Sequence, residues 1–160
     1  MQELRTNRSL FEIANGLDEA ICVTTNGMVK KNYLAVMGAG VAKQCADLFP
    51  STQQLLGMLL LSKGNCVHNL GKHCTTNSDG YTIDYLIFSF PTKHHWKSKS
   101  DINLIKKSAC EIMIEADTHN LKRIYLPQVG CKNGGLNWET DVYPAIKDIL
   151  DDRFIVLIRD

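Results

Sequence analysis

The chain has no long hydrophobic run, almost no net charge and no cysteine framework, and each absence excludes a class of protein. Its longest apolar run, LLGMLLL at residues 55–61, is far too short to cross a bilayer, so we expect no membrane partner. The 18 lysines and arginines nearly balance the 17 aspartates and glutamates, which leaves a net charge of +1. Any contact with nucleic acid therefore has to be local. The N-terminal stretch lacks the apolar segment of a secretory signal.

The six cysteines are scattered through the chain without the spacing of a disulfide framework. We interpret them as free thiols, which favours a reducing compartment and predicts a cytoplasmic protein. Four zinc-ligand types fall close together, at Cys66, His68, His73 and Cys74. Their spacing is not that of a usual structural zinc site, so we expect no metal and no cofactor.

Short apolar runs alternate with stretches of helical periodicity along the 160 residues. Strands are predicted at residues 20–25, 66–70, 81–90, 123–127 and 154–158. Helices are predicted at residues 41–49, at 50–61, from a cap at Ser100 or Asp101 to about residue 116, and from about residue 142 to 150. This alternation indicates one α/β domain over residues 1–160 with a largely parallel sheet. Because only a turn separates residues 66–70 from 81–90, we expect these two strands to be antiparallel and the sheet to be mixed.

Three loops of unusual composition follow three of the predicted strands. They are NGMVKKNYLAVMGAGVAK after 20–25, PTKHHWKSKS after 81–90 and QVGCKNGGLNWE after 123–127. If these strands are parallel, the loops meet at the carboxyl edge of the sheet, where open α/β sheets bind their ligands. A glycine-rich turn before a helix offers free backbone N–H groups to an anion. Two such loops that face each other predict a ligand with two adjacent phosphates.

The common nucleotide motifs do not explain these glycines. The residues after Gly40 are VAK, so the chain has no Walker A loop. A Rossmann fingerprint needs a third glycine where Lys43 stands, and no acidic residue is placed for a ribose after a second strand. Both classes of nucleotide site are therefore disfavoured.

The stretch VTTNG…VMGAGVAKQCADLFP, together with FPTKHHW and LPQVGCKNGGLNWE, resembles the macrodomain family. The resemblance runs in order over about residues 20–158. It is strongest to the branch that includes terminal ADP-ribose glycohydrolases and the antitoxins of DNA-ADP-ribosylating toxin–antitoxin pairs. It implies a three-layer α/β/α sandwich that binds ADP-ribose or an ADP-ribosylated macromolecule, DNA or protein. We expect the protein to be a monomer.

The resemblance also implies roles for individual residues. Asn26 matches the asparagine at the distal ribose, and residues 38–41 and 130–135 match the two phosphate loops. Lys93, the lysine of PTK, is the implied catalytic residue, because a neutral amine near the anomeric carbon can attack the opened ribose. The ligand-binding residues predicted in this way are Asn26, Met37, Gly38, Ala39, Gly40, Val41, Thr92, Gly130, Cys131, Lys132, Asn133, Gly134, Gly135 and Leu136.

The residues around the PTK motif leave two interpretations open. His94, His95 and Lys97 either help to activate the lysine of that motif or form a basic patch for a nucleic-acid phosphate. Trp96 and Trp138 are either stacking surfaces or core residues.

Two classes of function stay open. Lys93 favours a hydrolase that removes ADP-ribose from DNA, protein or a small phosphate ester. Gly134 stands where some glycohydrolases of this branch carry an aspartate, which favours a reader or sponge that binds ADP-ribose without turnover. Antitoxin-like members share the Gly-Gly form, so we prefer the hydrolase. An ADP-ribose-1''-phosphate phosphatase and a binder of another nucleotide are further alternatives.

Overall fold

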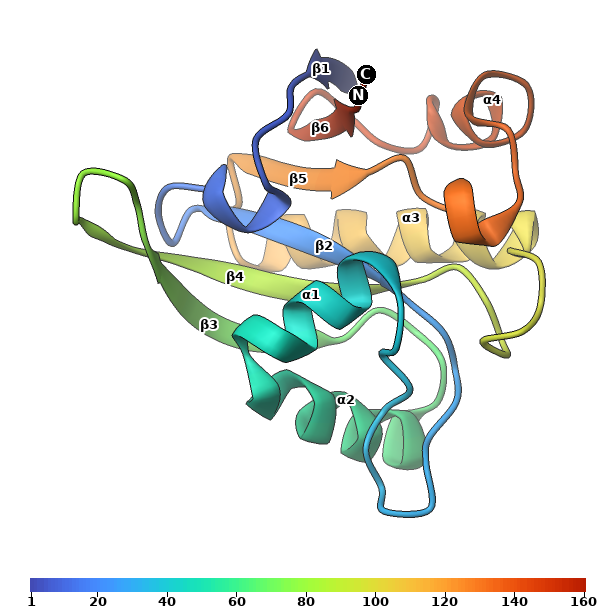
Figure 1. The fold of residues 1–160 in the computed structure, drawn as a ribbon. Helices are drawn as coiled ribbons and strands as arrows, with labels where there is room; N and C mark the ends of the chain where they lie inside the picture. Colours follow the sequence, from blue (N-terminus) through green and yellow to red (C-terminus); the bar gives the residue numbers. More distant parts are fainter.

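Six strands form a single sheet in the order β1-β6-β5-β2-β4-β3 in the computed structural model, which describes residues 1–160 (Figure 1). Their bounds are β1 Gln2–Arg5, β2 Glu19–Thr25, β3 Asn69–Thr76, β4 Thr82–Pro91, β5 Arg123–Pro127 and β6 Phe154–Ile158. Every neighbouring pair is parallel except β3 and β4, which form an antiparallel hairpin. The prediction of a mixed, largely parallel sheet is therefore confirmed.

Helices cover both faces of the sheet and make it the middle one of three layers (Figure 1). On one face lie the 3-10 turn η1 Leu10–Glu12 and the helices α1 Gly40–Leu48 and α2 Pro50–Lys63. On the other lie α3 Ile102–Thr118, the π-helical turn η3 Trp138–Val142 and α4 Tyr143–Ile146. The expected α/β/α sandwich is confirmed. None of these helices is long and apolar enough to cross a membrane.

The side chains of β2 alternate between the two hydrophobic clusters that these layers enclose. Ala20 and Cys22 lie in the cluster beneath α3, whereas Ile21 and Val23 lie in the cluster beneath α1 and α2. A parallel strand buried on both faces has to be apolar at every position, so it reads as a continuous hydrophobic run. This is why the runs at 20–25, 123–127 and 154–158 predict their strands correctly.

The sequence pattern misses β1 and overstates the last helix. All four residues of β1 are exposed, so QELR shows no apolar run, and the strand is held by parallel pairing with β6 at the edge of the sheet. The helix predicted at 142–150 is instead the turn η3 followed by the short α4, which ends at Ile146. The chain has to turn back there because β6 begins at Phe154.

The second predicted strand lies further along the chain than expected. Val67 and His68 are buried, but their backbone N–H groups donate to the side chains of Glu111 and Ser89 instead of joining the hairpin ladder. The strand register with β4 runs from Asn69 through the polar residues up to Thr76, and before it only the His68 carbonyl reaches β4, where it accepts from Ser89 N–H at 2.9 Å. Because β3 is an edge strand, its residues alternate between exposed and partly buried positions. In the sequence alone, such a polar stretch reads as a turn.

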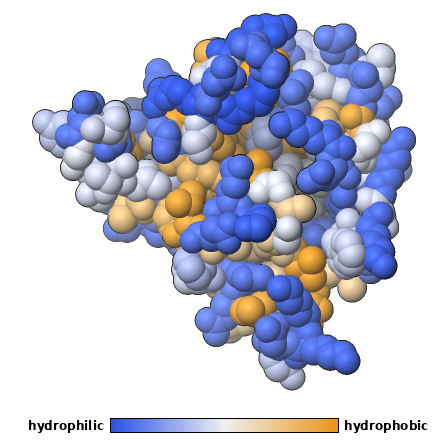
Figure 2. All heavy atoms as spheres, viewed as in Figure 1, coloured by the Kyte–Doolittle hydropathy of each residue, from blue (hydrophilic) through white to orange (hydrophobic).

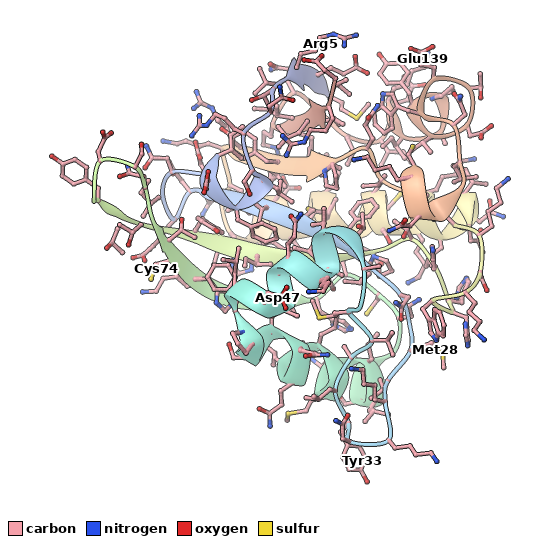
Figure 3. All side chains as sticks on the ribbon, viewed as in Figure 1. Arg5, Met28, Tyr33, Asp47, Cys74 and Glu139 are labelled. Carbon is pink, nitrogen blue, oxygen red and sulfur yellow. The ribbon has the colours of Figure 1, made fainter.

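A glycine inside α2 holds the loop between β2 and α1 against the helix. A Cβ at Gly57 would collide with the backbone oxygen of Tyr33. Beside this contact, the backbone N–H of Ala35 donates to Gln53 O at 3.0 Å, and the Gln53 amide donates to Ala35 O at 3.0 Å. Tyr33 itself lies at the tip of the loop and points outward (Figure 3). The close approach explains a glycine in the middle of a helix, where it otherwise costs stability.

We expect Gly57→Ala to lower the free energy of unfolding by about 1–2 kcal/mol, measured by urea denaturation. The reason is that an overpacked contact costs more than the roughly 1 kcal/mol that alanine gains in helix propensity. Gln54→Ala, at an exposed position of the same helix, is the matched control and should change stability by less than about 0.5 kcal/mol. A Gly57→Ala protein as stable as the wild type would show that the loop does not need this contact.

Candidate functional site

A cleft of about 540 Å³ opens at the carboxyl edge of the central strands. Because β2 is parallel to both β4 and β5, the loops that follow these three strands leave the sheet at the same edge. All three loops contribute to the cleft wall, which confirms that they meet. In the space-filling view, hydrophilic residues border a hollow with a more apolar floor (Figure 2).

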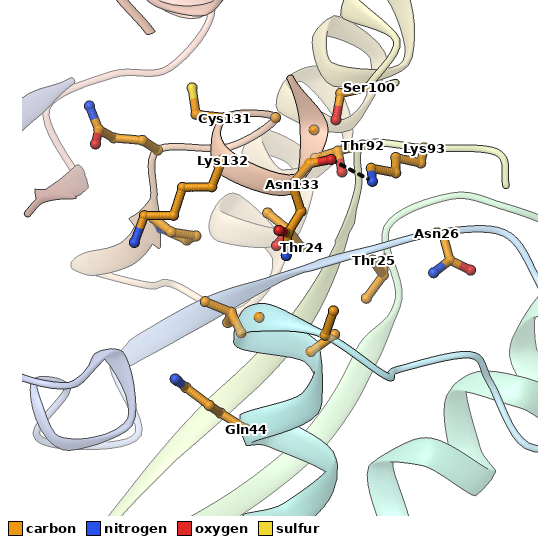
Figure 4. A pocket seen from close by; sticks show the side chains of 18 of the residues that line it. Thr24, Thr25, Asn26, Gln44, Thr92, Lys93, Ser100, Cys131, Lys132 and Asn133 are labelled. Carbon is orange, nitrogen blue, oxygen red and sulfur yellow. Dashed lines mark hydrogen bonds between the residues drawn. The ribbon is translucent and has the colours of Figure 1, made fainter. Parts of the chain in front are cut away.

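Most of the residues singled out in the sequence lie on the wall of this cleft (Figure 4). They are Asn26, Gly38, Ala39, Gly40, Val41, Thr92, Lys93, Gly130, Cys131, Lys132, Asn133 and Gly134. The other three lie outside the wall. Met37 is buried in the cluster beneath α1 and α2, Leu136 packs against the α3 cluster, and Gly135 lies against the side chain of Lys99.

The cleft also contains residues that the sequence analysis missed. They are Leu10, Thr24, Thr25, Val36, Ala42, Gln44, Ser100, Pro127, Gln128, Leu157 and Arg159, and Trp96, which the sequence left open as a stacking or a core residue, also lies in the wall. Leu157 and Arg159 lie at the carboxyl end of β6, so the edge rule that located the three loops could also have found these two. Leu10 belongs to η1, whose sequence carries no signal of a ligand site.

The first glycine-rich loop presents the N-terminus of α1 to the cleft. Ala39 is the N-cap and makes no side-chain hydrogen bond to the helix, so the first N–H groups of α1 depend on another partner. Gly40 has a φ of 58°, in the left-handed region. A Cβ at Gly40 would lie 3.3 Å from Asn133 Nδ2 of the facing loop. The two loops therefore face each other at Gly40 and Asn133, where a bulky side chain would fill the space between them.

The second glycine-rich loop is packed so tightly that residue 134 has no room for a side chain. The loop passes through the 3-10 turn η2 Lys132–Gly134, and the N–H of Ser100 donates to Gly134 O at 2.9 Å. A Cβ at Gly134 would collide with Ser100 Oγ. An aspartate at this position would require Ser100 to move. The cleft wall contains no aspartate or glutamate, so a nucleophile or general base in the cleft has to be another kind of side chain.

Lys93 connects the loop after β4 to the second glycine-rich loop. Its ammonium donates to Asn133 O at 2.9 Å and to Trp96 O at 3.4 Å (Figure 4). The side chain is only partly exposed and forms part of the cleft wall. The adjacent Thr92 is buried, and its N–H donates to Thr25 O at 3.0 Å, which ties this loop to the end of β2. The lysine is thus held at the junction of the three loops.

Asn26 is a turn residue and also reaches the cleft. Its amide donates to Val36 O at 3.0 Å, and its side-chain oxygen accepts from Met28 N–H at 2.9 Å. These bonds fix the start of the loop that leads to α1. A contact between Asn26 and a ribose stays a prediction.

Two buried hydroxyl groups in the cleft wall have no hydrogen-bond partner. Thr25 is 5% exposed and Ser100 is 7% exposed, and neither Thr25 Oγ1 nor Ser100 Oγ is paired within the protein. Buried polar atoms in native proteins are usually hydrogen-bonded. Both residues contribute to the cleft wall, but the two hydroxyl oxygens themselves are shielded from solvent, so a ligand reaches them only if the wall shifts.

All six cysteines are free thiols, as predicted. Cys131 lies in the cleft wall, where burial and the charge of Asp141 raise the pKa of its thiol, so it is a poor nucleophile at neutral pH. Of the four zinc-ligand types, only Cys66 and His68 are in contact, with Sγ 3.5 Å from Nε2. The His73 ring packs against Phe49 instead, and no group of three histidines, cysteines or acidic residues is placed to hold a metal ion.

Comparison with known proteins shows which family the chain is similar to. A family model described as "Macro domain" matches residues 29–143. A curated protein of Thermus aquaticus named DNA ADP-ribosyl glycohydrolase is 28% identical over 120 residues, which cover 75% of this chain and 32% of the relative. A protein of the same name from Mycobacterium tuberculosis is 26% identical over 131 residues, which cover 79% and 36%. The chain thus spans about a third of the length of these relatives.

Solved structures share the fold over nearly the whole chain. The macrodomain of Mycobacterium tuberculosis DarG has a TM-score of 0.70 at 23% identity, and the match covers 98% of this chain and 97% of that structure. A structure described as Thermosipho africanus DarTG in complex with ADP-ribose has a TM-score of 0.70 at 20% identity. This second match covers 99% of this chain and 42% of that structure.

Proposed function

This chain belongs to the macro domain family, and on that premise we propose that its cleft binds ADP-ribose. In this proposal the protein is a glycohydrolase that uses Lys93 to release ADP-ribose from DNA. The observation that carries the proposal is the position of Lys93, which is bonded to the second glycine-rich loop in a cleft that the first glycine-rich loop also lines. The name of the curated relatives supports DNA as the acceptor, and the DarTG complex supports ADP-ribose as the ligand. We further propose that residues 1–160 act as one domain, as a monomer in the cytoplasm.

Binding of the diphosphate depends on backbone groups. The free N–H groups at the N-terminus of α1, and those of Lys132 and Asn133 in the turn η2, are suited to bind one phosphate each, because the N–H of Gly134 is already paired within the turn whereas these donors are not. Asn26 then offers a hydrogen-bond partner to the hydroxyls of the distal ribose. In this orientation the anomeric carbon of that ribose lies toward Lys93.

The proposed reaction uses the neutral amine of Lys93 as the nucleophile. Both present partners of Lys93 Nζ are carbonyl oxygens, which accept hydrogen bonds from the amine and leave its lone pair free once a proton is lost. Ring opening first breaks the bond between the anomeric carbon and the ring oxygen, which takes up a proton, and leaves an iminium link to the base nitrogen. The lone pair of Lys93 adds to that iminium carbon, and the bond to the DNA base then breaks as the leaving nitrogen takes up a proton, which leaves an imine between lysine and sugar. Water then cleaves the bond between lysine and sugar and releases ADP-ribose.

A reader without turnover is the second candidate, and one observation favours it. The cleft wall contains no carboxylate, and residue 134 has no room for one. Without a carboxylate to act as general base, activation of the attacking water has to rely on the amine itself or on the substrate. The two candidates differ in one measurable property, which is release of ADP-ribose.

The decisive experiment incubates the protein with a single-stranded oligonucleotide that carries ADP-ribose on one base and follows the release of ADP-ribose by chromatography. Release at a rate proportional to protein concentration supports the hydrolase. Tight binding of the modified strand without release identifies a reader. Release from ADP-ribose-1''-phosphate or from ADP-ribosylated protein alone would identify one of the alternative substrates.

We expect ADP-ribose to bind at least about a hundredfold more tightly than AMP in isothermal titration calorimetry. The reason is that AMP offers one phosphate to two loops, so the charge-assisted hydrogen bonds of one loop, each worth about 1.5–3 kcal/mol, are lost. ADP is the matched control, because it carries both phosphates but no distal ribose, and its affinity should lie between the other two. Equal affinities for AMP and ADP-ribose would mean that the two loops do not act together on a diphosphate.

A further inference from the structure

We propose that the surface beside the mouth of the cleft, formed by residues 95–99 and called here the Trp96 platform, binds the single-stranded DNA that flanks an ADP-ribosylated base. This inference rests on the proposed function and deepens it, because it names where the polymer lies when its ADP-ribosyl group occupies the cleft. The platform has the sequence HWKSK and follows β4 along the chain.

The centre of the platform is an exposed tryptophan. Trp96 is 49% exposed although it also forms part of the cleft wall. Its ring stacks on His95, with the ring centroids 5.8 Å apart and the planes 24° from parallel, and Lys97 Nζ lies 5.1 Å from the Trp96 centroid. By contrast, Trp138 is 8% exposed and donates to the side chain of Glu3 in the edge strand β1. The chain therefore keeps one of its two tryptophans at the surface, next to the cleft.

The platform carries positive charge that no acidic residue neutralises. Lys97 and Lys99 are exposed and form no salt bridge, whereas the nearest carboxylate along the chain, Asp101, is paired with His94 at 3.1 Å. The hydrogen bond from His94 lowers the pKa of Asp101, so that carboxylate stays ionised and is hydrogen-bonded to His94 instead of a lysine. Since the whole protein has a net charge of only +1, these two lysines form a local basic patch.

The base of the platform is held in place by bonds from several segments. The N–H of Asp101 donates to Thr92 O at 2.9 Å and closes the loop. Gly27 N–H donates to His94 O at 3.2 Å, and the Asn65 amide donates to Lys93 O at 3.0 Å. An aromatic surface fixed in this way needs little ordering when a ligand binds, so less affinity is lost.

An exposed aromatic ring with flanking lysines matches the chemistry of a single nucleic-acid strand. An unpaired base offers a π-face to stack on the ring, and the neighbouring phosphates pair with the lysines. A duplex does not match, because its bases are already stacked on one another. When an ADP-ribosylated base lies at Lys93, the next nucleotide leaves the cleft past Trp96, which belongs to both surfaces. The geometry thus favours single-stranded DNA.

The test titrates the protein with an unmodified single-stranded oligothymidylate and follows intrinsic tryptophan fluorescence. We expect saturable quenching, because Trp96 is the exposed tryptophan, and binding that weakens as salt is raised. By anisotropy of a labelled strand, Trp96→Ala should weaken binding about 5- to 100-fold, whereas Trp96→Phe should keep most of it. Tyr81→Ala is the matched control, because Tyr81 is an exposed aromatic residue that precedes β4, at the opposite edge of the sheet, and it should have no effect.

The outcomes separate this inference from the proposed function, since the oligonucleotide carries no ADP-ribose. Lys97→Ala should reduce the slope of log affinity against log salt by about 0.7 and leave the calorimetric affinity for free ADP-ribose unchanged. Absence of quenching, equal affinity for a duplex of the same sequence, or full DNA affinity in Trp96→Ala each overturns the platform, even if ADP-ribose binds. Quenching by DNA together with no binding of ADP-ribose supports the platform and overturns the proposed function.

Discussion

Replacement of Lys93 by alanine is expected to reduce the release of ADP-ribose from ADP-ribosylated DNA at least about a thousandfold, as is usual when a nucleophile is removed. The affinity for free ADP-ribose should change less than about tenfold, because the diphosphate is bound by backbone groups of the two glycine-rich loops. Lys93→Arg should be nearly as damaging, since a guanidinium does not lose its proton in proteins and cannot act as a nucleophile. Single-turnover release assays and calorimetry measure the two effects separately.

Lys132 provides the matched control for this experiment. It is also a lysine of the cleft wall, but its side chain is exposed and lies on the other side of Asn133 from Lys93 (Figure 4). Lys132→Ala should therefore change the release rate only a few-fold, through loss of an exposed charge near the diphosphate. Full turnover by Lys93→Arg would exclude an amine nucleophile. If Lys93→Ala and Lys132→Ala reduced the release rate equally, both lysines would contribute only their positive charge.

Gly40→Val is expected to weaken ADP-ribose binding at least about a hundredfold in calorimetry. A Cβ at this position would lie 3.3 Å from Asn133 Nδ2 of the facing loop, and valine would add two further carbons there. The branched side chain would keep the phosphate from the N–H groups at the start of α1, each of which is worth about 1.5–3 kcal/mol to a charged ligand. A left-handed φ of 58° adds strain for a β-branched residue.

Gly40→Val has two effects, backbone strain at a left-handed residue and loss of the phosphate-binding surface. A substitution at a second glycine separates them. Gly80 has a φ of 83°, lies in the turn between β3 and β4 and has open space where a Cβ would lie. Gly80→Val therefore carries the same left-handed cost away from the cleft, and it should lower the melting temperature without changing ADP-ribose affinity. If Gly40→Val binds ADP-ribose as tightly as Gly80→Val, the first loop is only a turn between strand and helix.

The central part of the fold could be predicted because its strands are buried on both faces. The runs at 20–25, 123–127 and 154–158 are apolar at nearly every position, so their pattern is independent of neighbouring elements. The edge strands gave no such signal. All of β1 is exposed, and β3 alternates, so only their hydrogen bonds to β6 and β4 define them. The bonds of β1 come from residues distant in sequence, whereas β3 pairs with its neighbour across a short turn whose polar residues continue into the strand.

The site could be predicted where it is made of short segments with distinctive residues. Gly40 and Gly134 mark places where backbone approaches another group, and the structure shows the group in each case, Asn133 and Ser100. Trp96 was placed beside the lysine by sequence alone, but whether it was exposed depended on the packing of the loop. Arg159 and Leu10 lie at opposite ends of the chain, and no local pattern brings them to one cleft wall.

The pairing of β1 with β6 has a consequence for how the protein opens and closes. This pairing joins residues 2–5 to residues 155–158, so it closes almost the entire chain into a loop, yet it covers only exposed side chains. A contact of such long range that buries so little is expected to form late in folding and to break first in the native state. The cleft is coupled to this event, because Arg159 of its wall donates to Thr6 O directly after β1, whereas β6 itself stays paired with β5. Transient release of the first strand therefore frees the Arg159 side chain at the cleft while the rest of the sheet edge stays in place.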